Sequence, residues 1–477
     1  MTACDEPLRI VAGGIRCHSS SRAHSSCSAQ CLGSPRTRYT MTTLPPWSIS
    51  TEATQQPLYV SLVQGIDGKL YGTTNTGGAS NYGTVFAINL RGGLTTLHSF
   101  SNTDGSNPGA GLAMVADGTL YGTTFSGGTY GVGTVFQITQ SGDLTSLYSF
   151  SGSDGLPVSP LVLGFNGMFY GTTAVGGSSG DHGTIFQISP GGTLTTLHSF
   201  SGQDGADPQA GLVQAANGEL FGTASEDGQN RAGTAFSIRP SGTFQELFAF
   251  DNTDGNTPIG GLIQGTDGNL YGTTEYGGTS YGTVFQITAA GTAVVLYTFS
   301  GGADGGNPTG TLVQATDGNF YGTTQSGGTS TIVCPGGCGT IFKITSSGAL
   351  TTLYDFDNTH GAYPAGGLVQ HTDGNLYGTT SSGGLGDGTV FRLSTGLSSF
   401  VKTVPTFGLA RATIAILGYG LTGVTSVTFN GTPAAFTLES PTAIRATVPS
   451  GATTGTVQVV ADGATLSSNV AFVVLGG

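Results

Sequence analysis

Charged residues are scarce in this chain. Asp, Glu, Lys and Arg make up 9% of its 477 residues, against about 25% in an average soluble protein. Coiled coils and long solvent-facing helices depend on Glu, Lys and Arg, so the composition disfavours both. The 14 basic residues are outnumbered by 27 acidic ones, which gives a formal net charge of −13. An acidic surface repels phosphate backbones, so we expect no nucleic acid partner.

Long hydrophobic runs are also lacking. No stretch approaches the roughly 20 apolar residues that a membrane-spanning helix needs, so we expect no membrane span. The first forty residues differ from the rest, because they hold four of the six cysteines and five arginines against Asp5 and Glu6. Their best apolar stretch, residues 8–15, is interrupted by Arg9 and two glycines and makes a poor signal peptide. We expect residues 1–40 to be a disordered or misassigned leader, with Met41 as an alternative start.

Glycine, by contrast, is abundant, and it belongs to a tandem repeat. Each repeat has four short β-favouring runs separated by Asp-Gly, Gly-Gly or Ser-Gly pairs. Four antiparallel strands per repeat predict an all-β, seven-bladed β-propeller, which we assign to residues 41–400. A solenoid is the rival architecture, but it requires atypical capping repeats that are not evident. The phrase Y-G-T-T, or a close variant, begins at Tyr71, Tyr121, Tyr170, Phe221, Tyr271, Tyr321 and Tyr377.

The seventh repeat lacks a clear fourth strand. Residues 43–49 lie where a fourth-strand sequence belongs, with Leu44 aligned to Leu94 and Trp47 to Leu97. We predict that this N-terminal strand completes the last blade, which closes the ring and protects both open edges.

One face of such a propeller carries nearly all of the sequence variation. In an up-and-down blade, the second loop and the linker to the next blade share a face. The second loops vary most and contain the one insertion, residues 330–338. Insertions confined to one face often mark a binding surface, so this face is the predicted binding face.

Two resemblances follow from these motifs. The phrases D-G-N-L-Y-G-T-T and G-T-V-F-Q-I-T recur over residues 43–396 and resemble the bacterial GloVer tandem repeat, found in predicted surface-associated proteins. This resemblance implies a propeller in an extracellular or cell-surface setting. From about Val404 the repeat gives way to alternating runs with frequent turns, which predict a small β-sandwich. Residues 403–475 resemble an IPT/TIG domain, an immunoglobulin-like fold that we expect to act as a spacer or interaction module.

Several residue types recur in equivalent positions of the repeats. We expect the Tyr of Y-G-T-T and the third-strand Phe to pack between blades. We interpret the Asp-Gly pairs of the linkers (Asp104, Asp154, Asp204, Asp254 and Asp304) as turn residues. Calcium is the alternative, but one Asp per turn does not supply the converging oxygen ligands that Ca²⁺ needs. We expect no metal and no cofactor.

Glutamine ends the first strand of five repeats. These amides are predicted to line the central channel, where they would satisfy backbone groups or hold water, with a ligand site as the less favoured alternative. The residues are Gln64, Gln214, Gln264, Gln314 and Gln370.

The variable loops supply the candidate ligand-binding residues. Aromatic rings mixed with carboxylates and amides suit a glycan, or a protein partner, whereas solvated loop tips are the bland interpretation. The candidates are Tyr82, Tyr130, Asp181, His182, Glu226, Asp227, Arg231, Glu275, Tyr276, Tyr281 and Asp387. Cys334 and Cys338 in the insertion are a predicted disulfide if the protein is exported, and free thiols otherwise.

Catalysis has weaker support. His182 with Asp181, and Glu226 or Asp227 from the next repeat, come nearest to an acid–base cluster, but no catalytic motif surrounds them. The sequence therefore predicts a monomeric, non-enzymatic, surface or secreted binding or adhesion protein that engages a glycan or protein partner. The alternatives are a glycan-active hydrolase or lyase that uses the same face, and a structural surface repeat without a specific ligand.

Overall fold

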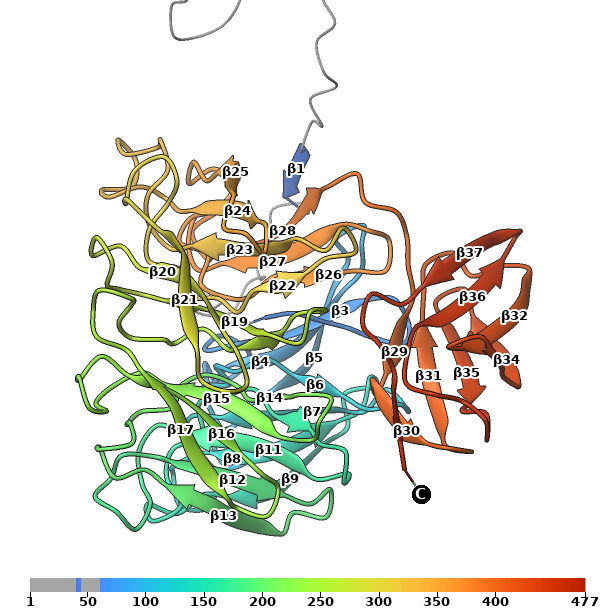
Figure 1. The fold of residues 1–477 in the computed structure, drawn as a ribbon, viewed down its shortest axis with the longest axis horizontal. Coiled ribbons are helices and arrows are strands. Elements are labelled where there is room, and N and C mark those ends of the chain that lie inside the picture. Colours follow the sequence, from blue (N-terminus) through green and yellow to red (C-terminus); the bar gives the residue numbers. More distant parts are fainter. Residues whose placement is uncertain (1–39, 44–60, 477) are drawn as a thin grey trace, which may run out of the picture. The chain divides into compact units, whose positions relative to one another are not determined.

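The computed structural model describes residues 40–43 and 61–476, and all of the regular secondary structure in these ranges consists of β-strands. Strands β1 to β28 form seven four-stranded antiparallel sheets, which are the blades of a propeller (Figure 1). Strands β29 to β38 form a separate sandwich. The predicted all-β architecture is confirmed.

The blades share one strand pattern, in the order first, second, third and fourth strand. The first strands are β2 (Val63–Gln64), β6 (Ala113–Met114), β10 (Val162–Leu163), β14 (Val213–Gln214), β18 (Ile263–Gln264), β22 (Val313–Gln314) and β26 (Val369–Gln370). The second strands are β3 (Leu70–Thr74), β7 (Leu120–Thr124), β11 (Phe169–Thr173), β15 (Leu220–Ala224), β19 (Leu270–Thr274), β23 (Phe320–Thr324) and β27 (Leu376–Thr380). The third strands are β4 (Thr84–Ile88), β8 (Thr134–Ile138), β12 (Thr184–Ile188), β16 (Thr234–Ile238), β20 (Thr283–Ile287), β24 (Thr340–Ile344) and β28 (Thr389–Ser394). The fourth strands are β5 (Leu94–Ser99), β9 (Leu144–Ser149), β13 (Leu194–Ser199), β17 (Phe244–Ala249), β21 (Ala293–Thr298), β25 (Leu350–Asp355) and, in the last blade, β1 (Thr40–Thr43).

The ring closes through β1, which pairs with β28 as predicted, but in a different register. Met41 lies opposite Leu393, whereas Leu94 of the first blade lies opposite Ile88, the residue equivalent to Leu393. Met41 therefore takes the place of Leu94, and the predicted alignment of Leu44 with Leu94 is wrong by three residues. The sequence M-T-T-L matches L-T-T-L, and the two prolines at 45 and 46 lack the N–H groups that a ladder needs. Leu44 and Trp47 lie outside the described residues.

The core lies between neighbouring blades. Residues of the second strands are buried throughout, and Tyr271 packs with Val284 of its own blade and Phe320 of the next. The Tyr271 and Phe320 rings stack with their centroids 4.0 Å apart. A Cβ on Gly272 would come within 2.6 Å of the Phe285 ring, so the Gly of Y-G-T-T lets strand and ring approach closely. The predicted packing role of the repeated Tyr and Phe is confirmed.

The C-terminal β-sandwich has its own core. One sheet has the order β29 (Lys402–Val404), β31 (Thr413–Leu417), β35 (Ala443–Thr447), β34 (Phe436–Ser440). The second sheet has the order β33 (Thr432–Pro433), β32 (Val424–Phe429), β36 (Val457–Ala461), β37 (Ala464–Ser467). A parallel pair, β30 (Phe407–Leu409) with β38 (Val473–Leu475), completes the sandwich. The inward side chains of the two sheets, among them Ile416, Val427 and Val459, form one buried cluster.

The sandwich packs on the turns that join first and second strands in the propeller. Thr442 Oγ1 donates to the Ile66 carbonyl at 2.9 Å, and Arg445 Nη1 donates to the Ala116 carbonyl at 2.7 Å. The rings of Phe407 and Phe165 lie 4.8 Å apart. These contacts involve the first three blades, so this sandwich is a docked domain and not a free spacer.

Candidate functional site

Backbone bridges define a loop face on the propeller. The linker that leaves one blade pairs with the second loop of the next, as in Ala206 with Glu226 and Gly306 with Ser326. The loop face therefore consists of the linkers and the second loops. The second loops are residues 75–83, 125–133, 174–183, 225–233, 275–282, 325–339 and 381–388. The sandwich contacts the turns at the other end of the strands, so it leaves the loop face open.

One position on this face is equivalent in all seven blades, just before the Gly-Thr that starts the third strand. In five of the blades its backbone carbonyl accepts a hydrogen bond from the following linker, for example from Asn107 N to Tyr82 O at 2.8 Å and from Asp207 N to His182 O at 3.0 Å. Because the bond uses only the main chain, it holds the backbone at this position and places no demand on the residue type. The seven residues are Tyr82, Val132, His182, Ala232, Tyr281, Cys338 and Asp387.

Exposed hydrophobic side chains gather in the second loops. Eight of the thirteen large hydrophobic residues exposed in the described chain lie there. The sequence analysis identified Tyr82, Tyr130, Tyr276 and Tyr281, and it missed the other four, Phe125, Ile332, Val333 and Leu385. The insertion was a usable signal for two of these, because an aliphatic pair in a surface loop has no packing partner in the repeat pattern.

The suggested acid–base cluster forms only in part. His182 Nδ1 lies 3.6 Å from Asp227 Oδ2 in the next blade. Asp181 instead accepts a hydrogen bond from the backbone of Gly176 at 2.6 Å, so its carboxylate caps its own loop. Glu226 is exposed, and its backbone forms the bridge to Ala206. Of the three carboxylates proposed as partners of His182, the structure places only that of Asp227 near its imidazole ring.

The second loop of the fifth blade holds one carboxylate, Glu275, and two tyrosines, Tyr276 and Tyr281. Burial raises the pKa of Glu275, and a hydrogen bond with the Tyr276 hydroxyl partly opposes that rise. The same hydrogen bond raises the pKa of Tyr276. The Tyr281 ring lies over Gly301, where an added Cβ would come within 2.4 Å of it. Gly301 also has a positive φ of 73°, so the ring and the turn both require glycine there.

Two remaining candidates lie apart from this group. Arg231 is exposed on the fourth blade and has a φ of 58°. Asp387 of the last blade has one carboxylate oxygen that is buried without a hydrogen-bond partner among the described residues.

The linker aspartates are engaged by their own turns. Asp204 accepts hydrogen bonds from Ser201 N at 2.8 Å and from His198 Nε2 at 2.8 Å. Asp304 does the same with Ser300 N and with the Tyr297 hydroxyl. Within residues 40–43 and 61–476, no group of three or more His, Cys, Asp or Glu residues is arranged to hold a metal ion. The contacts support the turn interpretation.

The repeated glutamines join neighbouring blades. Gln214 Oε1 accepts a hydrogen bond from Phe165 N of the preceding blade at 2.7 Å, and Gln314 Oε1 accepts one from Thr266 N at 2.9 Å. The same bond joins Gln264 to Ala216, Gln370 to Thr316 and Gln64 to Thr372. Their oxygens thus satisfy backbone groups.

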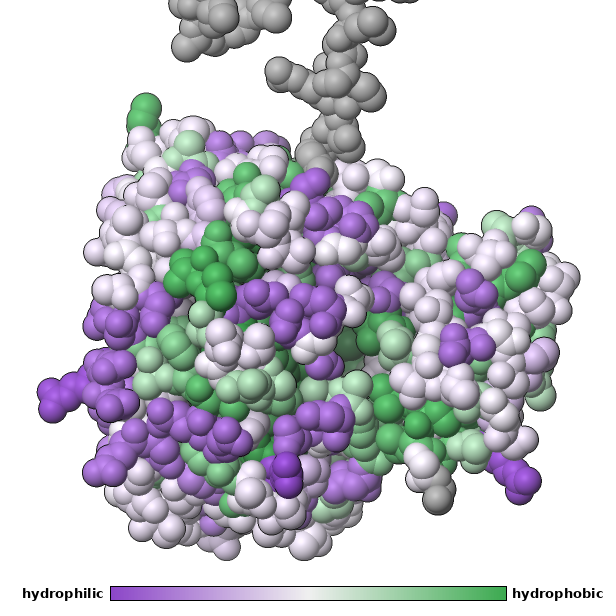
Figure 2. Space-filling model, viewed as in Figure 1, coloured by the Kyte–Doolittle hydropathy of each residue, from purple (hydrophilic) through white to green (hydrophobic). Residues whose placement is uncertain are grey.

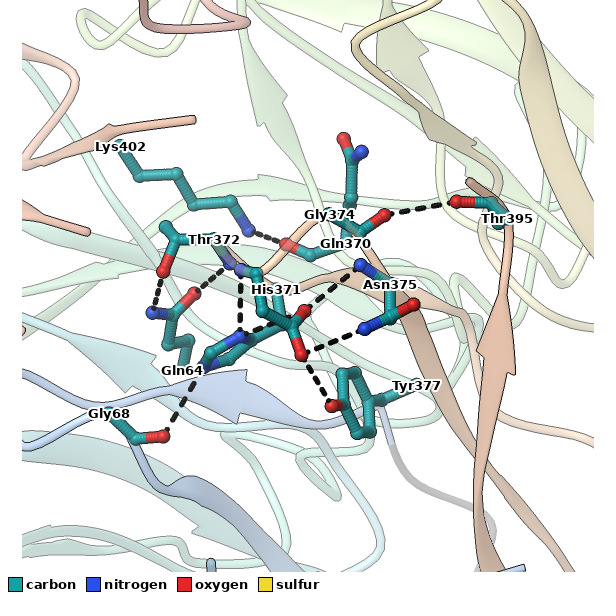
Figure 3. Close-up of polar contacts among 11 residues, drawn as sticks. Gln64, Gly68, Gln370, His371, Thr372, Gly374, Asn375, Tyr377, Thr395 and Lys402 are labelled. Carbon is teal, nitrogen blue, oxygen red and sulfur yellow. Dashed lines mark hydrogen bonds and ion pairs between the residues drawn. The ribbon is translucent and has the colours of Figure 1, made fainter. Parts of the chain in front are cut away.

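A buried polar cluster lies at the seam between the last and first blades (Figure 3). His371 is fully buried, accepts from Asp373 N at 3.1 Å, and its Nε2 lies 3.2 Å from the Gly68 carbonyl. Burial acts to raise the pKa of Asp373, but His371 and the groups of Asn375 lower it overall. Lys402 of the sandwich donates to the Gln370 carbonyl, and burial lowers its pKa to about 8. The cluster therefore ties ring closure to the docked sandwich.

The insertion of the sixth blade is closed by a disulfide between Cys334 and Cys338, whose Cα atoms lie 5.2 Å apart. Both cysteines are buried. The residues just before them, Ile332 and Val333, are 98% and 59% exposed.

Together these features define a seven-bladed β-propeller with an open loop face and a docked C-terminal sandwich. The Gloeobacter/Verrucomicrobia repeat model matches residues 39–217, 144–331 and 213–435, and the IPT/TIG domain model matches residues 398–474. The chain belongs to the Gloeobacter/Verrucomicrobia repeat family and carries a C-terminal IPT/TIG domain. Both predicted resemblances are confirmed.

Solved structures share the fold at low sequence identity. A streptogramin B lyase has 15% identity and a TM-score of 0.54, over 75% of this chain and 97% of that chain. A fungal alcohol oxidase solved in complex with copper has 14% identity and a TM-score of 0.53, over 91% and 99%. At such identity the likeness concerns the fold alone. Proteins with curated descriptions gave no match to the sequence. In the described residues, no helix has the length and apolar character to cross a membrane.

Proposed function

We propose that this protein is a non-enzymatic recognition protein whose loop face binds a glycan. The observation that carries the proposal is the gathering of exposed hydrophobic side chains in the second loops. Five of the eight are aromatic: Tyr82, Phe125, Tyr130, Tyr276 and Tyr281. Monomeric proteins seldom expose such a concentration of apolar side chains without a partner, and aromatic rings offer flat faces to sugar rings.

Charge narrows the class of glycan. The second loops of this face carry Asp181, Glu226, Asp227, Glu275 and Asp387 against Arg231. Like charges repel, so uronate-containing or sulfated chains are disfavoured and neutral polysaccharides are favoured.

An array of neutral and acidic polysaccharides tests this function. We expect the full chain to retain neutral polysaccharides, and the triple variant Tyr82→Ala/Tyr130→Ala/Tyr276→Ala to lose at least tenfold in affinity. Leu438→Ala in the sandwich, an exposed hydrophobic residue away from the loop face, serves as the matched control. Absence of binding to every glycan would contradict the proposal, as would equal binding by the triple variant. Cleavage of the polysaccharide during incubation would instead favour the alternative function, a glycan-active enzyme.

A surface or secreted location is part of the same proposal. The Cys334–Cys338 disulfide supports it, because disulfides persist in oxidising compartments. Thiol labelling of protein taken directly from its native cells tests the location. We expect both cysteines to resist labelling before reduction and the protein to appear in the surface or medium fraction. Free thiols in a cytoplasmic fraction would overturn it.

A further inference from the structure

The apex of the blade-six insertion is aliphatic and unusually exposed. The Ile332 side chain is 98% exposed and that of its neighbour Val333 is 59% exposed. In Figure 2 a hydrophobic protrusion stands at the upper left, over the loop that joins β23 and β24 in Figure 1. Branched aliphatic side chains have no flat face for sugar stacking, so glycan binding does not explain them.

The base of the insertion is fixed. The disulfide holds buried Cys334 to buried Cys338, and Gly337 N donates to the Cys334 carbonyl at 2.8 Å. Gly327 N donates to the Gly336 carbonyl at 2.8 Å, so the loop satisfies part of its backbone internally. A preformed loop loses little conformational entropy when its apex meets a partner.

The loop that carries the apex is polar and has no charged residue of its own. Residues 325–339 contain no charged residue, and three hydroxyl side chains, Thr329, Ser330 and Thr331, precede the aliphatic pair. Thr329 Oγ1 donates to Asp355 Oδ2 at 3.1 Å, which fixes this shoulder to the blade. An apolar apex above hydroxyl-bearing shoulders matches the change from acyl chains to headgroups at a membrane interface.

The apex belongs to an arc over three blades. On one side, Gly306 lies close to the Tyr281 ring and bridges to Ser326, which is in the same second loop as the insertion. On the other side, the Cys338 carbonyl accepts from Tyr363 N at 2.9 Å. The adjoining bridge from Ala362 to Ser382 leads to the loop that holds Leu385, which is 64% exposed.

We propose that the blade-six insertion is a membrane-contact loop, which places Ile332 and Val333 shallowly in a zwitterionic lipid surface. Leu385 and Tyr281 of the neighbouring blades join the contact at its margin. Apolar tips spread over three blades fit an extended flat surface better than a single pocket in a partner protein. Glu275, Asp304, Asp355 and Asp387 flank the arc, and their charge disfavours anionic lipid. The inference does not require glycan binding, because Ile332 and Val333 carry it; Tyr281 is the residue that both proposals use.

Flotation with vesicles tests the proposal on the full chain. We expect the protein to bind phosphatidylcholine vesicles, and to bind less when a quarter of the lipid is phosphatidylglycerol. The double variant Ile332→Ser/Val333→Ser should lose at least tenfold in partitioning, with an unchanged melting temperature because both side chains are exposed. The matched control, Leu438→Ser/Val470→Ser in the sandwich, should bind as the parent chain does.

Insertion can also be observed directly. In an Ile332→Trp variant, the indole emission should shift to the blue when phosphatidylcholine vesicles are added, and a Leu438→Trp variant should show no shift. Failure of the parent chain to bind these vesicles would overturn the proposal. Equal binding by the double variant, or stronger binding to anionic vesicles, would do so as well. A loss of vesicle binding that leaves glycan retention intact would show that the two surfaces act separately.

Discussion

Gln64 and Thr372, 308 residues apart in the sequence, form a two-way hydrogen-bonded pair that joins the first blade to the last. The Gln64 amide donates to Thr372 Oγ1 at 2.7 Å, and the Gln64 oxygen accepts from Thr372 N at 3.0 Å. Both residues are buried. The pair closes the inner edge of the ring, while β1 closes the outer edge.

Replacement of Gln64 by Leu should weaken this closure. The side chain fits, because Leu163 stands at the equivalent position of the third blade. The change leaves the buried Thr372 N–H without its acceptor, which should cost about 1–3 kcal/mol in the free energy of unfolding. Urea unfolding measures the cost. Gln264→Leu is the matched control, and its cost should be smaller because the Gln264 bonds are exposed. Equal costs at the two positions would contradict the closure role.

Acid should destabilise the propeller through its linker carboxylates. Burial acts to raise the pKa of Asp204, but hydrogen bonds from Ser201 and His198 lower it overall below the ordinary value of 3.8. A pKa that is lower in the folded state gives stability that is present above about pH 4 and lost as the pH falls through the folded value. The melting temperature should therefore be level from pH 7 to 5 and fall below pH 4. Asp204→Asn should lower it at pH 7 and flatten the acid fall.

Asp254 offers the control for this pH effect. In its blade Phe248 stands where His198 stands, and burial raises the pKa of Asp254. A raised carboxyl pKa favours the protonated form in the folded state, so Asp254→Asn should cost less at pH 7 than Asp204→Asn. The interpretation fails if both variants keep the parent slope below pH 4.

The Tyr of the second strand and the Asp of the turn before it should behave as a coupled pair. The Tyr321 hydroxyl donates to Asp317 Oδ2 at 2.9 Å, whereas the fourth blade has Phe221 and Asn217 at these positions. Tyr321→Phe should cost about 1 kcal/mol. Adding Asp317→Asn should cost less than its effect in the parent chain, with a coupling of about 0.5–1 kcal/mol in a double-mutant cycle. Strict additivity would show that the pair is not coupled.

The Gly of Y-G-T-T should not tolerate a side chain. A Cβ on Gly122 would approach the buried Phe136 ring to 2.6 Å and Leu112 to 2.8 Å. Gly122→Ala should therefore destabilise by about 1–3 kcal/mol through overpacking. Gly152→Ala is the control, since no heavy atom lies within 4 Å of its added Cβ, and it should change stability by less than about 0.5 kcal/mol. Thermal melts measure the stability of both variants. Equal stability would contradict the prediction and would show that the core rearranges to accept the added methyl group.

Local chemistry made much of the fold predictable. Repetition fixed the equivalence of Tyr71, Tyr271 and Tyr377, and a residue repeated in so many blades has a packing role by geometry. The closing strand was predictable in existence but not in register. The predicted alignment of Leu44 with Leu94 followed an apolar pattern. In the structure Met41 takes that position, because it is the residue opposite Leu393 in the neighbouring strand.

The loop residues were predictable only as individuals. Sequence alone marked His182, Asp181 and Asp227 as candidates, but a turn contact inside one blade claimed Asp181 while the next blade brought Asp227 to His182. Which carboxylate meets His182 depends on the distance between neighbouring blades, and a local sequence pattern contains no information on that distance. The same reason explains why the docking of Thr442 and Arg445 on the propeller could not be foreseen.

The sequence by itself determined the β-strands, their grouping in seven repeats and the cores between them, because strand preference, turn chemistry and burial act over a few neighbouring residues. Tertiary structure alone decided the register of β1, the engagement of the glutamine oxygens with the preceding blade, and which of the loop carboxylates meets His182. Those features arise from contacts between residues far apart in the chain, and only closure of the ring brings such residues together.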